Sequence, residues 1–294
     1  MLISHALRDA ASPALTRLEA QMLLLHTLGR STQDRAWLLA HDQDMLDADT
    51  LTRYQAACQR RVAGEPVAYI TGHKAFFGLD LQIDARVLDP RPDTETLVDW
   101  ALEVMATLAS PCVLDLGTGS GAIALALAHA RPDAQVWAVD ASLDALAVAQ
   151  ANAQRLDLPV QFQHGNWFAP ATPSTAPPTT PPATPGWAAQ RFEVMVSNPP
   201  YIAAADPHLA ALTHEPLCAL AAGPDGLDDL RTIVSGATVH LQPGGWLLLE
   251  HGHDQAAAVR QLLVDGGFED VQSRNDIAGI ARCSGGRRAR CGQQ

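Results

Sequence analysis

The sequence predicts an α/β protein with a doubly wound parallel sheet, preceded by a small helical domain and a β-hairpin linker. Two observations lead to this prediction. From Val113 onward, short apolar runs alternate with segments of helical character, which is typical of successive βαβ units. Before residue 65, apolar residues recur at helical intervals instead. A length of 294 residues is enough for both parts.

Residues 1–64 are predicted to form a bundle of short amphipathic helices. Thr16 and Glu19 have the spacing of a capping box, which marks the start of a helix. Apolar residues lie at helical intervals along this stretch, namely Leu15, Leu18, Met22 and Leu25. Gly29 is well placed to end the helix, because glycine is common just after helix C-termini.

Two further helices are expected in this domain. Ser31 is expected to cap one that carries Trp37 and Leu38, because a serine hydroxyl can accept a hydrogen bond from a free helical N–H group. The other is expected over Leu51–Ala63. The apolar stripe is interpreted as the inner seam of the bundle, with a partner-docking face as the alternative.

Residues 65–90 are predicted to form the hairpin linker. Leu79–Asp84 alternates apolar and polar residues, as a half-exposed strand does. Val67–Thr71 precedes this strand, and Gly72 and Gly78 supply turn residues between the two runs.

Residues 91–288 are predicted to form the sheet domain. A helix is expected over Thr94–Ala106. Strands are expected at residues 113–116, 136–140, 160–163, 192–197 and 246–250. Ligands of doubly wound sheets bind beyond the carboxyl ends of the strands, so motifs that follow these strands can converge on one cleft.

A stretch rich in proline, threonine and alanine interrupts this domain at residues 169–190. Such a composition cannot build an apolar core, so the stretch is predicted to be a disordered surface insertion. A ligand for a proline-binding partner is the less favoured interpretation. Residues 289–294 are predicted to be a flexible tail.

The charge balance is acidic, with 20 Lys and Arg against 32 Asp and Glu and a formal net charge of −12. Basic contacts to phosphates supply most nucleic-acid affinity, so no direct nucleic-acid binding is expected. The first residues lack the basic and long apolar regions of a signal peptide, and no apolar run approaches a membrane span. We expect a cytoplasmic protein that does not bind membranes.

The five cysteines are scattered and include no C-x-x-C pair, which indicates neither a disulfide framework nor a zinc site. His251 and His253 are weak candidates for metal ligands, because they lack helical spacing and have only Glu250 as a neighbouring carboxylate. No metal is therefore expected.

A glycine-rich segment, Gly117-Thr118-Gly119-Ser120-Gly121, follows the strand predicted at 113–116 and runs into a helix-forming stretch. Glycines let the backbone turn tightly and approach a ligand, and the helix N-terminus adds free N–H groups. The spacing differs from the G-x-G-x-x-G of dinucleotide binders. Alone, the segment leaves NAD and S-adenosylmethionine as about equal candidates.

Two aspartates favour S-adenosylmethionine. Asp115 precedes the glycines, where a carboxylate would repel a pyrophosphate but attract sulfonium and ammonium charges. Asp140 ends the next predicted strand, about twenty residues beyond the glycines, where acidic side chains bind ribose hydroxyls in nucleotide-binding βαβ units.

The segment Asn198-Pro199-Pro200-Tyr201 follows the strand predicted at 192–197. Prolines fix their own φ angles and push the preceding residue into an extended conformation, so a rigid ledge is expected. Its side-chain amide and main-chain carbonyls offer acceptors to a planar NH₂ group, either of a carboxamide or of adenine. A simple proline turn is the alternative. Together with the glycine-rich segment and the two aspartates, the ledge favours a methyltransferase.

Nearly the whole chain resembles the HemK/PrmC family, S-adenosylmethionine-dependent enzymes that methylate a glutamine side-chain nitrogen in peptide chain release factors. The blocks that carry the resemblance are Leu18–Leu25, Arg61–Gly72, Pro90–Glu95, Asp115–Gly121, Asn198–Ile202 and Glu250–Gly252. The Asn-Pro-Pro-Tyr segment is shared with adenine methyltransferases, but its combination with the second and third blocks is more specific. The chain departs from the family pattern at Ala75, Phe77, Asp89 and Asp93.

The resemblance implies a Rossmann-like class I methyltransferase domain that uses S-adenosylmethionine and releases S-adenosylhomocysteine. The implied cofactor-binding residues are Gly117, Thr118, Gly119, Ser120, Gly121, Asp140, Trp167 and Asn198. The implied catalytic residues are Asn198, Pro199 and Tyr201, and with Pro200 they would bind the substrate glutamine. The resemblance places Trp167 near the adenine of the cofactor. The alternative is that Trp167 only packs behind the strand. The implied partners are class 1 release factors, recognised in part by residues 1–64.

Two other functions stay open at this point. An adenine N6-methyltransferase would use the same ledge on a flipped base, but it calls for a basic groove and a base-recognition domain, and the sequence indicates neither. A non-catalytic adaptor would bind the cofactor without turnover on any partner.

Overall fold

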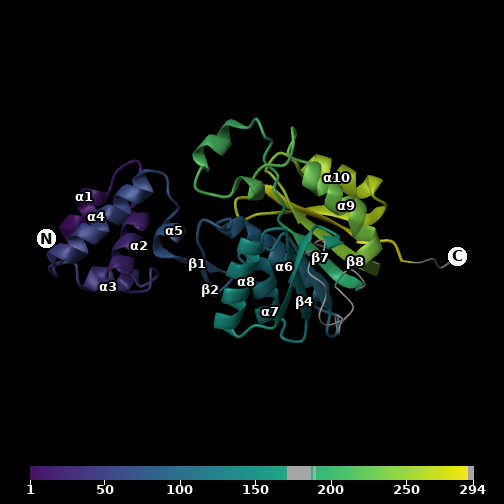
Figure 1. The fold of residues 1–294 in the computed structure, drawn as a ribbon, viewed down its shortest axis with the longest axis horizontal. Coiled ribbons are helices and arrows are strands. Elements are labelled where there is room, and N and C mark those ends of the chain that lie inside the picture. Colours follow the sequence, from purple (N-terminus) through teal and green to yellow (C-terminus); the bar gives the residue numbers. More distant parts are fainter. Residues whose placement is uncertain (171–186, 188–189, 291–294) are drawn as a thin grey trace, which may run out of the picture. The chain divides into compact units, whose positions relative to one another are not determined.

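The structure is a computed structural model and describes residues 1–170, 187 and 190–290. The chain forms two compact units, Met1–His73 with Ile83–Ala85, and Lys74–Gln82 with Arg86–Gln294 (Figure 1). The finer domain boundaries predicted at residues 64, 90 and 288 stay predictions. The predicted insertion at 169–190 and tail at 289–294 lie largely outside the described residues.

The first unit is helical. Its helices are α1 (Ile3–Ala10), α2 (Arg17–Thr27), α3 (Arg35–Ala40), α4 (Ala48–Val62) and α5 (Val67–Thr71). The capping box is confirmed: Thr16 Oγ1 accepts from the Glu19 N–H at 3.3 Å, and Glu19 Oε2 accepts from the Thr16 N–H at 2.8 Å. The core of the unit is apolar and includes Leu23, Leu24 and Tyr54, all fully buried.

Three details of this unit differ from the prediction. Of the predicted stripe, Leu15 and Leu25 are confirmed as buried, but Leu18 is wrong, because it is 49% exposed and the buried face of α2 carries Leu23 and Leu24 instead. Ser31 does not cap α3, since its hydroxyl accepts from the Gln33 N–H in a turn before the helix. Helix α4 starts earlier than Leu51, because Asp47 caps it by accepting from the Thr50 N–H at 2.7 Å.

The hairpin is formed by other residues than predicted. Val67–Thr71 is helix α5 and not the first strand, because Gly72, with φ of 74°, ends a helical turn there. The two strands are β1 (His73–Phe76) and β2 (Leu79–Gln82). The second strand confirms the alternating pattern, with Leu79 and Leu81 buried.

The second unit is a sheet flanked by helices. Its strands are β3 (Cys112–Leu116), β4 (Gln135–Asp140), β5 (Val160–Asn166), β6 (Ala169–Pro170), β7 (Phe192–Ser197), β8 (Leu241–Glu250), β9 (Phe268–Asn275) and β10 (Ala281–Arg288). Its α-helices are α6 (Glu95–Met105), α7 (Ala122–Ala130), α8 (Leu143–Leu156), α9 (Asp228–His240) and α10 (Ala256–Asp265). Short 3₁₀ turns include η1 (Pro92–Thr94), η3 (Pro207–Ala211) and η4 (Leu217–Ala219).

The strand order is β6-β5-β4-β3-β7-β8-β10-β9. The five predicted strands are confirmed as a parallel array, β5-β4-β3-β7-β8. The expectation of a purely parallel sheet is corrected, since β10 pairs antiparallel with both β8 and β9. Neither added strand was predicted, because β10 contains two adjacent glycines and three arginines and β9 is mostly polar.

The sheet has a topological switch point at β3. The chain adds β4 and β5 on one side of β3 and then returns to place β7 on its other side. Ligands of doubly wound sheets bind beyond the carboxyl ends of the strands at such a point. Apolar residues such as Leu114 and Met195 are fully buried in β3 and β7, which fixes both strands in the core.

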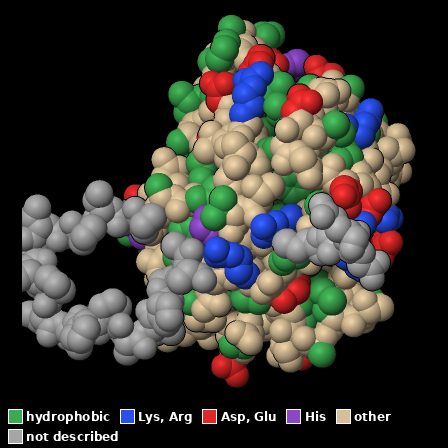
Figure 2. Space-filling view, turned by 90° about the vertical axis from the view of Figure 1, so that its right-hand side faces the viewer, with side chains coloured by type: hydrophobic (Ala, Val, Ile, Leu, Met, Phe, Trp, Pro, Cys, Tyr) green, Lys and Arg blue, Asp and Glu red, His purple; other side chains and the backbone are tan. Residues whose placement is uncertain are grey.

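Charges of both signs occur on the surface. On the face shown in Figure 2, Lys and Arg side chains lie in small separate groups with Asp and Glu side chains near them. Among the described residues, no helix has the length and apolar character needed to cross a membrane.

Candidate active site

The glycine-rich segment forms a tight loop between β3 and α7. Gly117, Gly119 and Gly121 have φ angles of 72°, 55° and 85°, which an L side chain rarely adopts. At Gly117 the space for a side chain is also tight, because an added Cβ would lie 3.2 Å from the Trp167 ring. Gly121 is the N-cap of α7, so the free N–H groups of this helix follow the loop directly.

Asp115, in strand β3, is hydrogen-bonded to the loop through Thr118. Its Oδ2 accepts from the Thr118 hydroxyl at 2.7 Å, while among the described residues Oδ1 is buried without a hydrogen-bond partner. Burial raises the pKa of Asp115 to about 7, and the bond from Thr118 opposes that rise. A buried carboxyl with one unused acceptor fits a cationic ligand group near the loop.

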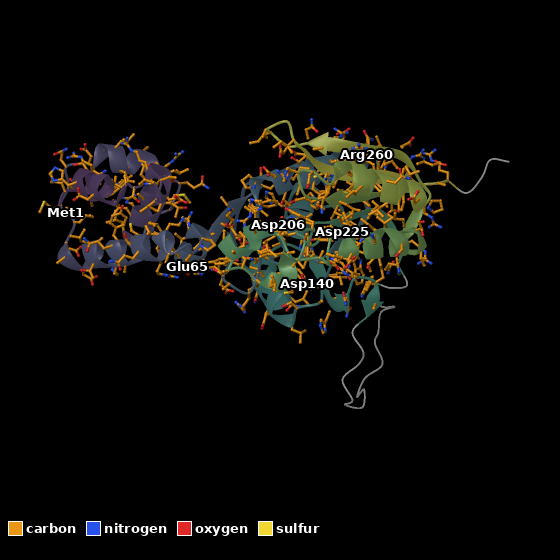
Figure 3. The ribbon with its side chains drawn as sticks, turned by 90° about the horizontal axis from the view of Figure 1, so that it is seen from above. Met1, Glu65, Asp140, Asp206, Asp225 and Arg260 are labelled. Atoms are coloured by element: carbon orange, nitrogen blue, oxygen red, sulfur yellow. The ribbon has the colours of Figure 1, made fainter. Side chains whose placement is uncertain are left out.

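Asp140 lies at the carboxyl end of β4 (Figure 3). Its two oxygens accept main-chain N–H groups, from Gly119 and from Ser142, each at 2.8 Å. Burial raises the pKa of Asp140, and these main-chain bonds oppose the rise. The carboxyl is therefore fixed against the glycine loop, where its remaining lone pairs suit ribose hydroxyls.

We expect Asp140→Ala to raise the KM for S-adenosylmethionine about tenfold or more with a smaller change in kcat, because it removes contacts present in ground and transition states alike. Calorimetric titration of the purified variant with the cofactor checks this. Asp144→Ala, which removes an exposed carboxylate from the first turn of α8, is the matched control. Unchanged cofactor affinity in Asp140→Ala would show that Asp140 only holds the loop.

Trp167 has the packing role that the sequence left as an alternative. Its ring lies against Gly117, its Nε1–H donates to Asp229 Oδ1 at 3.0 Å, and it packs against the core of the second unit. The role beside an adenine ring stays a prediction.

The Asn-Pro-Pro-Tyr ledge follows β7. Leu116 and Ser197 are register partners in β3 and β7, so Gly117 and Asn198, which follow them, start side by side. The Ser197 hydroxyl joins the two strand ends by donating to the Leu116 carbonyl at 2.7 Å. The structure thus brings the predicted cofactor loop and the predicted substrate ledge to neighbouring strand ends.

Each end of the ledge is held by a hydrogen bond. Asn198 Nδ2 donates to Thr94 Oγ1 at 3.2 Å. The Tyr201 hydroxyl donates to Glu250 Oε1 at 3.4 Å, and the Tyr201 carbonyl accepts from Gln255 Nε2 at 3.0 Å. Burial and the Glu250 carboxyl raise the pKa of Tyr201 well above its usual range, so its hydroxyl keeps its proton.

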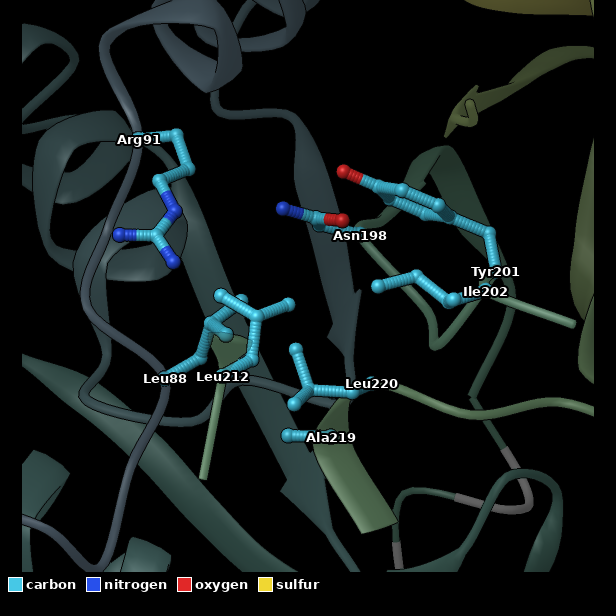
Figure 4. Close-up of a pocket in the computed structure, with 8 residues that line it drawn as sticks. All are labelled: Leu88, Arg91, Asn198, Tyr201, Ile202, Leu212, Ala219 and Leu220. Atoms are coloured by element: carbon cyan, nitrogen blue, oxygen red, sulfur yellow. The ribbon is translucent and has the colours of Figure 1, made fainter. Parts of the chain in front are cut away.

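A cavity of about 230 Å³ opens beside the ledge. Figure 4 shows Asn198, Tyr201 and Ile202 on one side of it and Arg91 and Leu88 on the other. The remaining lining residues are apolar, namely Leu212, Ala219 and Leu220. The cavity suits a short side chain with an aliphatic stem and a polar NH₂ end.

A cluster of charged side chains holds Arg91 in one wall of this cavity, and its two carboxylates, Asp89 and Glu215, are buried. Arg91 Nη2 pairs with Glu215 Oε1 at 2.5 Å, and the Asp89 N–H donates to Glu215 Oε2 at 3.3 Å. Lys74 Nζ lies 2.9 Å from Asp89 Oδ1. Arg91 Nη1 also lies 3.3 Å from Asp89 Oδ2, so the departure from the family pattern at Asp89 is accommodated by ion pairs with Lys74 and Arg91.

Sequence reasoning gave no role to Thr94, Glu250 or Gln255, although the first two lie in the family blocks. The buried contacts of Thr94 and Glu250 depend on tertiary structure, and no local pattern indicates them. Gln255 was missed altogether, since only the fold brings this N-cap residue of α10 to the Tyr201 carbonyl.

His251 is a core residue. Its Nδ1 lies 2.9 Å from the Gly252 carbonyl and its Nε2 lies 2.8 Å from Ser284 Oγ. Across the described part of the chain, no three His, Cys, Asp or Glu side chains come together in an arrangement that could hold a metal ion.

Comparison with known proteins gives matches over both units. Residues 2–72 match the PrmC N-terminal domain, and residues 110–276 match a methyltransferase domain. The release factor glutamine methyltransferase of Burkholderia pseudomallei is 50% identical over 285 residues, which cover 94% of this chain and 93% of that protein. The enzyme of the same name from Bordetella pertussis is 48% identical, with 94% of this chain and 96% of that protein covered.

A solved structure with a similar fold is the hMettl16 catalytic domain, with a TM-score of 0.52 and 14% identity over 84% of each chain. At this identity the likeness concerns the fold alone, and it confirms the predicted Rossmann-like α/β class. The identity to the curated relatives, together with the matched N-terminal domain, shows that this chain belongs to the release factor glutamine methyltransferase family.

Proposed function

We propose that this chain transfers a methyl group from S-adenosylmethionine to the side-chain amide nitrogen of the glutamine in the Gly-Gly-Gln motif of class 1 release factors. The observation that carries the proposal is the Asn198 carboxamide, held at the end of β7 in an apolar-walled cavity, beside the glycine loop at the end of β3. Family membership supports the same substrate. We further propose that the protein acts in the cytoplasm, and that residues 1–64 contribute to partner recognition.

The residues at the switch point fit the cofactor. Gly117 to Gly121 would form its cradle, Asp140 would accept the ribose hydroxyls, and the Asp115 carboxyl would face its positive charges. Trp167 and Asn198 would complete the cofactor site. When bound, S-adenosylmethionine supplies an electrophilic methyl group, and S-adenosylhomocysteine is the product.

The ledge would activate the substrate amide. An amide nitrogen is a poor nucleophile, because its lone pair is delocalised into the carbonyl. Hydrogen bonds from its two N–H groups to Asn198 Oδ1 and the Pro199 carbonyl would orient the nitrogen and favour positive charge on it. Pro200 keeps the ledge rigid and the Tyr201 side chain forms the wall. The nitrogen would lose one of its two protons after it has accepted the methyl group, so catalysis would be positioning and electrostatic stabilisation.

Glycines beside the target glutamine would suit this cavity. Glycine has no side chain to meet Leu88 or Leu212, and it adopts the tight backbone conformations that a loop needs to enter a narrow site.

A competition assay tests the proposal against adenine methylation. Purified protein, labelled cofactor, a release factor and an adenine-containing oligonucleotide are incubated together, and the label in each acceptor is counted. We expect label in the release factor alone, and none when its Gly-Gly-Gln glutamine is replaced by alanine. Label in the oligonucleotide alone would overturn the proposal, and cofactor binding without transfer to either acceptor would favour an adaptor.

A further inference from the structure

A chain of hydrogen bonds connects the Asn198 carboxamide to a buried carboxyl. Asn198 Nδ2 donates to the Thr94 hydroxyl at 3.2 Å, and this hydroxyl lies close enough to the Glu250 carboxyl to lower its pKa. Thr94 is 3% exposed and Glu250 is 1% exposed. The three residues come from the end of β7, the turn η1 before α6 and the end of β8, so the fold itself assembles the chain.

The bonds in this chain have a defined direction. A hydroxyl has one hydrogen to donate. Because Thr94 Oγ1 accepts from Asn198, its own hydrogen is left for another acceptor, and the nearby Glu250 carboxyl in its ionised form only accepts. The Tyr201 hydroxyl donates to Oε1 of the same carboxyl at 3.4 Å. An ionised Glu250 therefore orients both hydroxyls toward itself.

The direction matters because the two ends of a carboxamide are chemically unlike. With Nδ2 held by Thr94, Oδ1 is the end of Asn198 left to accept a hydrogen bond in the cavity that Asn198 lines. A substrate NH₂ group needs that acceptor. In a reversed carboxamide, the NH₂ group of Asn198 would face the NH₂ group of the substrate. Two donors cannot form a hydrogen bond with each other, so the substrate amide would bind poorly.

We propose that Thr94 and Glu250 are positioning residues, which fix the Asn198 carboxamide with its oxygen toward the substrate. This inference rests on the proposed function for its kinetic consequence, but the orientation itself can be measured without a substrate.

The charge on Glu250 is the variable that this arrangement depends on. Among its neighbours, Arg282 stabilises the carboxylate, Asp93 opposes it, and the Tyr201 hydroxyl and the Cys283 thiol face it from the ledge and from β10. Burial outweighs the stabilising contacts and raises the pKa of Glu250 to about 7. Its Oε2 has no hydrogen-bond partner among the described residues, so no hydrogen bond at that oxygen stabilises the ionised form.

A protonated Glu250 can donate to Thr94, which allows the whole chain to reverse. The carboxylate is the form that orients Asn198 correctly. We therefore expect a high kcat above a pH of about 7, where Glu250 is ionised, and a lower kcat at more acidic pH. Asp115 also has a pKa of about 7, so a variant is needed to separate the two carboxyls.

The test compares Thr94→Val, Thr94→Ser and Glu250→Gln in steady-state methyl transfer to a release factor. Thr94→Val keeps the shape and removes the hydroxyl, and kcat should fall about 10- to 100-fold while cofactor affinity stays unchanged. Thr94→Ser restores the hydroxyl and should regain most of the lost rate. Thr96→Val makes the same change outside the network and is the control. Glu250→Gln should lower kcat and remove the step near pH 7.

The orientation of Asn198 can also be followed without a substrate, by NMR of ¹⁵N-labelled protein. The side-chain amide signal of Asn198 is identified by its absence in the spectrum of Asn198→Ala. We expect this signal to shift with a midpoint near pH 7, and the shift to disappear in both Thr94→Val and Glu250→Gln. A wild-type protein that fails to methylate the release factor but shows this titration would refute the proposed function and leave the inference standing. An Asn198 signal that titrates identically in Glu250→Gln, or an active Thr94→Val with wild-type kcat, would overturn the inference.

Discussion

Asn198→Ala is expected to lower kcat for methyl transfer by about 10²-fold or more, with little change in the free energy of unfolding. The substitution removes the side-chain acceptor that faces the cavity, whereas the ledge keeps its prolines and the bonds that hold Tyr201. The asparagine is only partly buried, so its truncation leaves no large void in the core.

Steady-state kinetics with a release factor, together with thermal denaturation, measures both quantities. Asn275→Ala is the matched control, because it truncates an exposed asparagine at the end of β9. Activity of Asn198→Ala within a few-fold of the wild type would remove Asn198 from the chemistry.

Gly226→Ala is expected to destabilise the protein and to reduce methyl transfer together. Gly226 has a φ of 74°, and an added Cβ would lie 2.2 Å from the Tyr201 carbonyl oxygen and 2.8 Å from Gln255 Nε2. The substitution therefore pushes on the carbonyl that Gln255 holds in place. Backbone strain and the clash together should lower the free energy of unfolding by about 2–5 kcal/mol, and the displaced ledge should lower kcat about tenfold or more.

Gly279→Ala separates strain from clash. Gly279 has a φ of 80° in the turn between β9 and β10, and an added Cβ there meets nothing within 4 Å. This substitution should lower the free energy of unfolding by about 1–2 kcal/mol through backbone strain alone and leave kcat unchanged. Denaturant unfolding and kinetics on both variants check the comparison, and equal effects of the two on kcat would contradict the role given to the Tyr201 carbonyl.

The parallel part of the sheet was predictable because buried parallel strands are short apolar runs bounded by turn residues, as in Val113–Leu116. The antiparallel edge was not, since β10 has a glycine pair where an added Cβ would clash with neighbours such as Leu248 and Phe268. Those glycines are required by tertiary packing, and glycine in isolation argues against a strand. Val67–Thr71 is a similar case, because β-branched and aromatic residues favour a strand locally, whereas a glycine at its end closes a helical turn.

The parts of the site that depend on backbone conformation, the glycine-rich loop and the proline ledge, were predictable from the sequence. Positive-φ glycines and consecutive prolines leave direct marks in the sequence, and both segments lie where the strand pattern placed them. The supporting side chains leave no such mark. Thr94, Glu250 and Gln255 reach the ledge from elements distant in sequence, and only the folded chain brings them together.

Peptide mass spectrometry of a purified release factor, after reaction with this protein and S-adenosylmethionine, identifies the residue that accepts the methyl group. We expect one added methyl group, located by fragmentation on the side-chain nitrogen of the Gly-Gly-Gln glutamine and absent without the cofactor. A release factor that stays unmodified, or one that carries the methyl group on another residue, would contradict it.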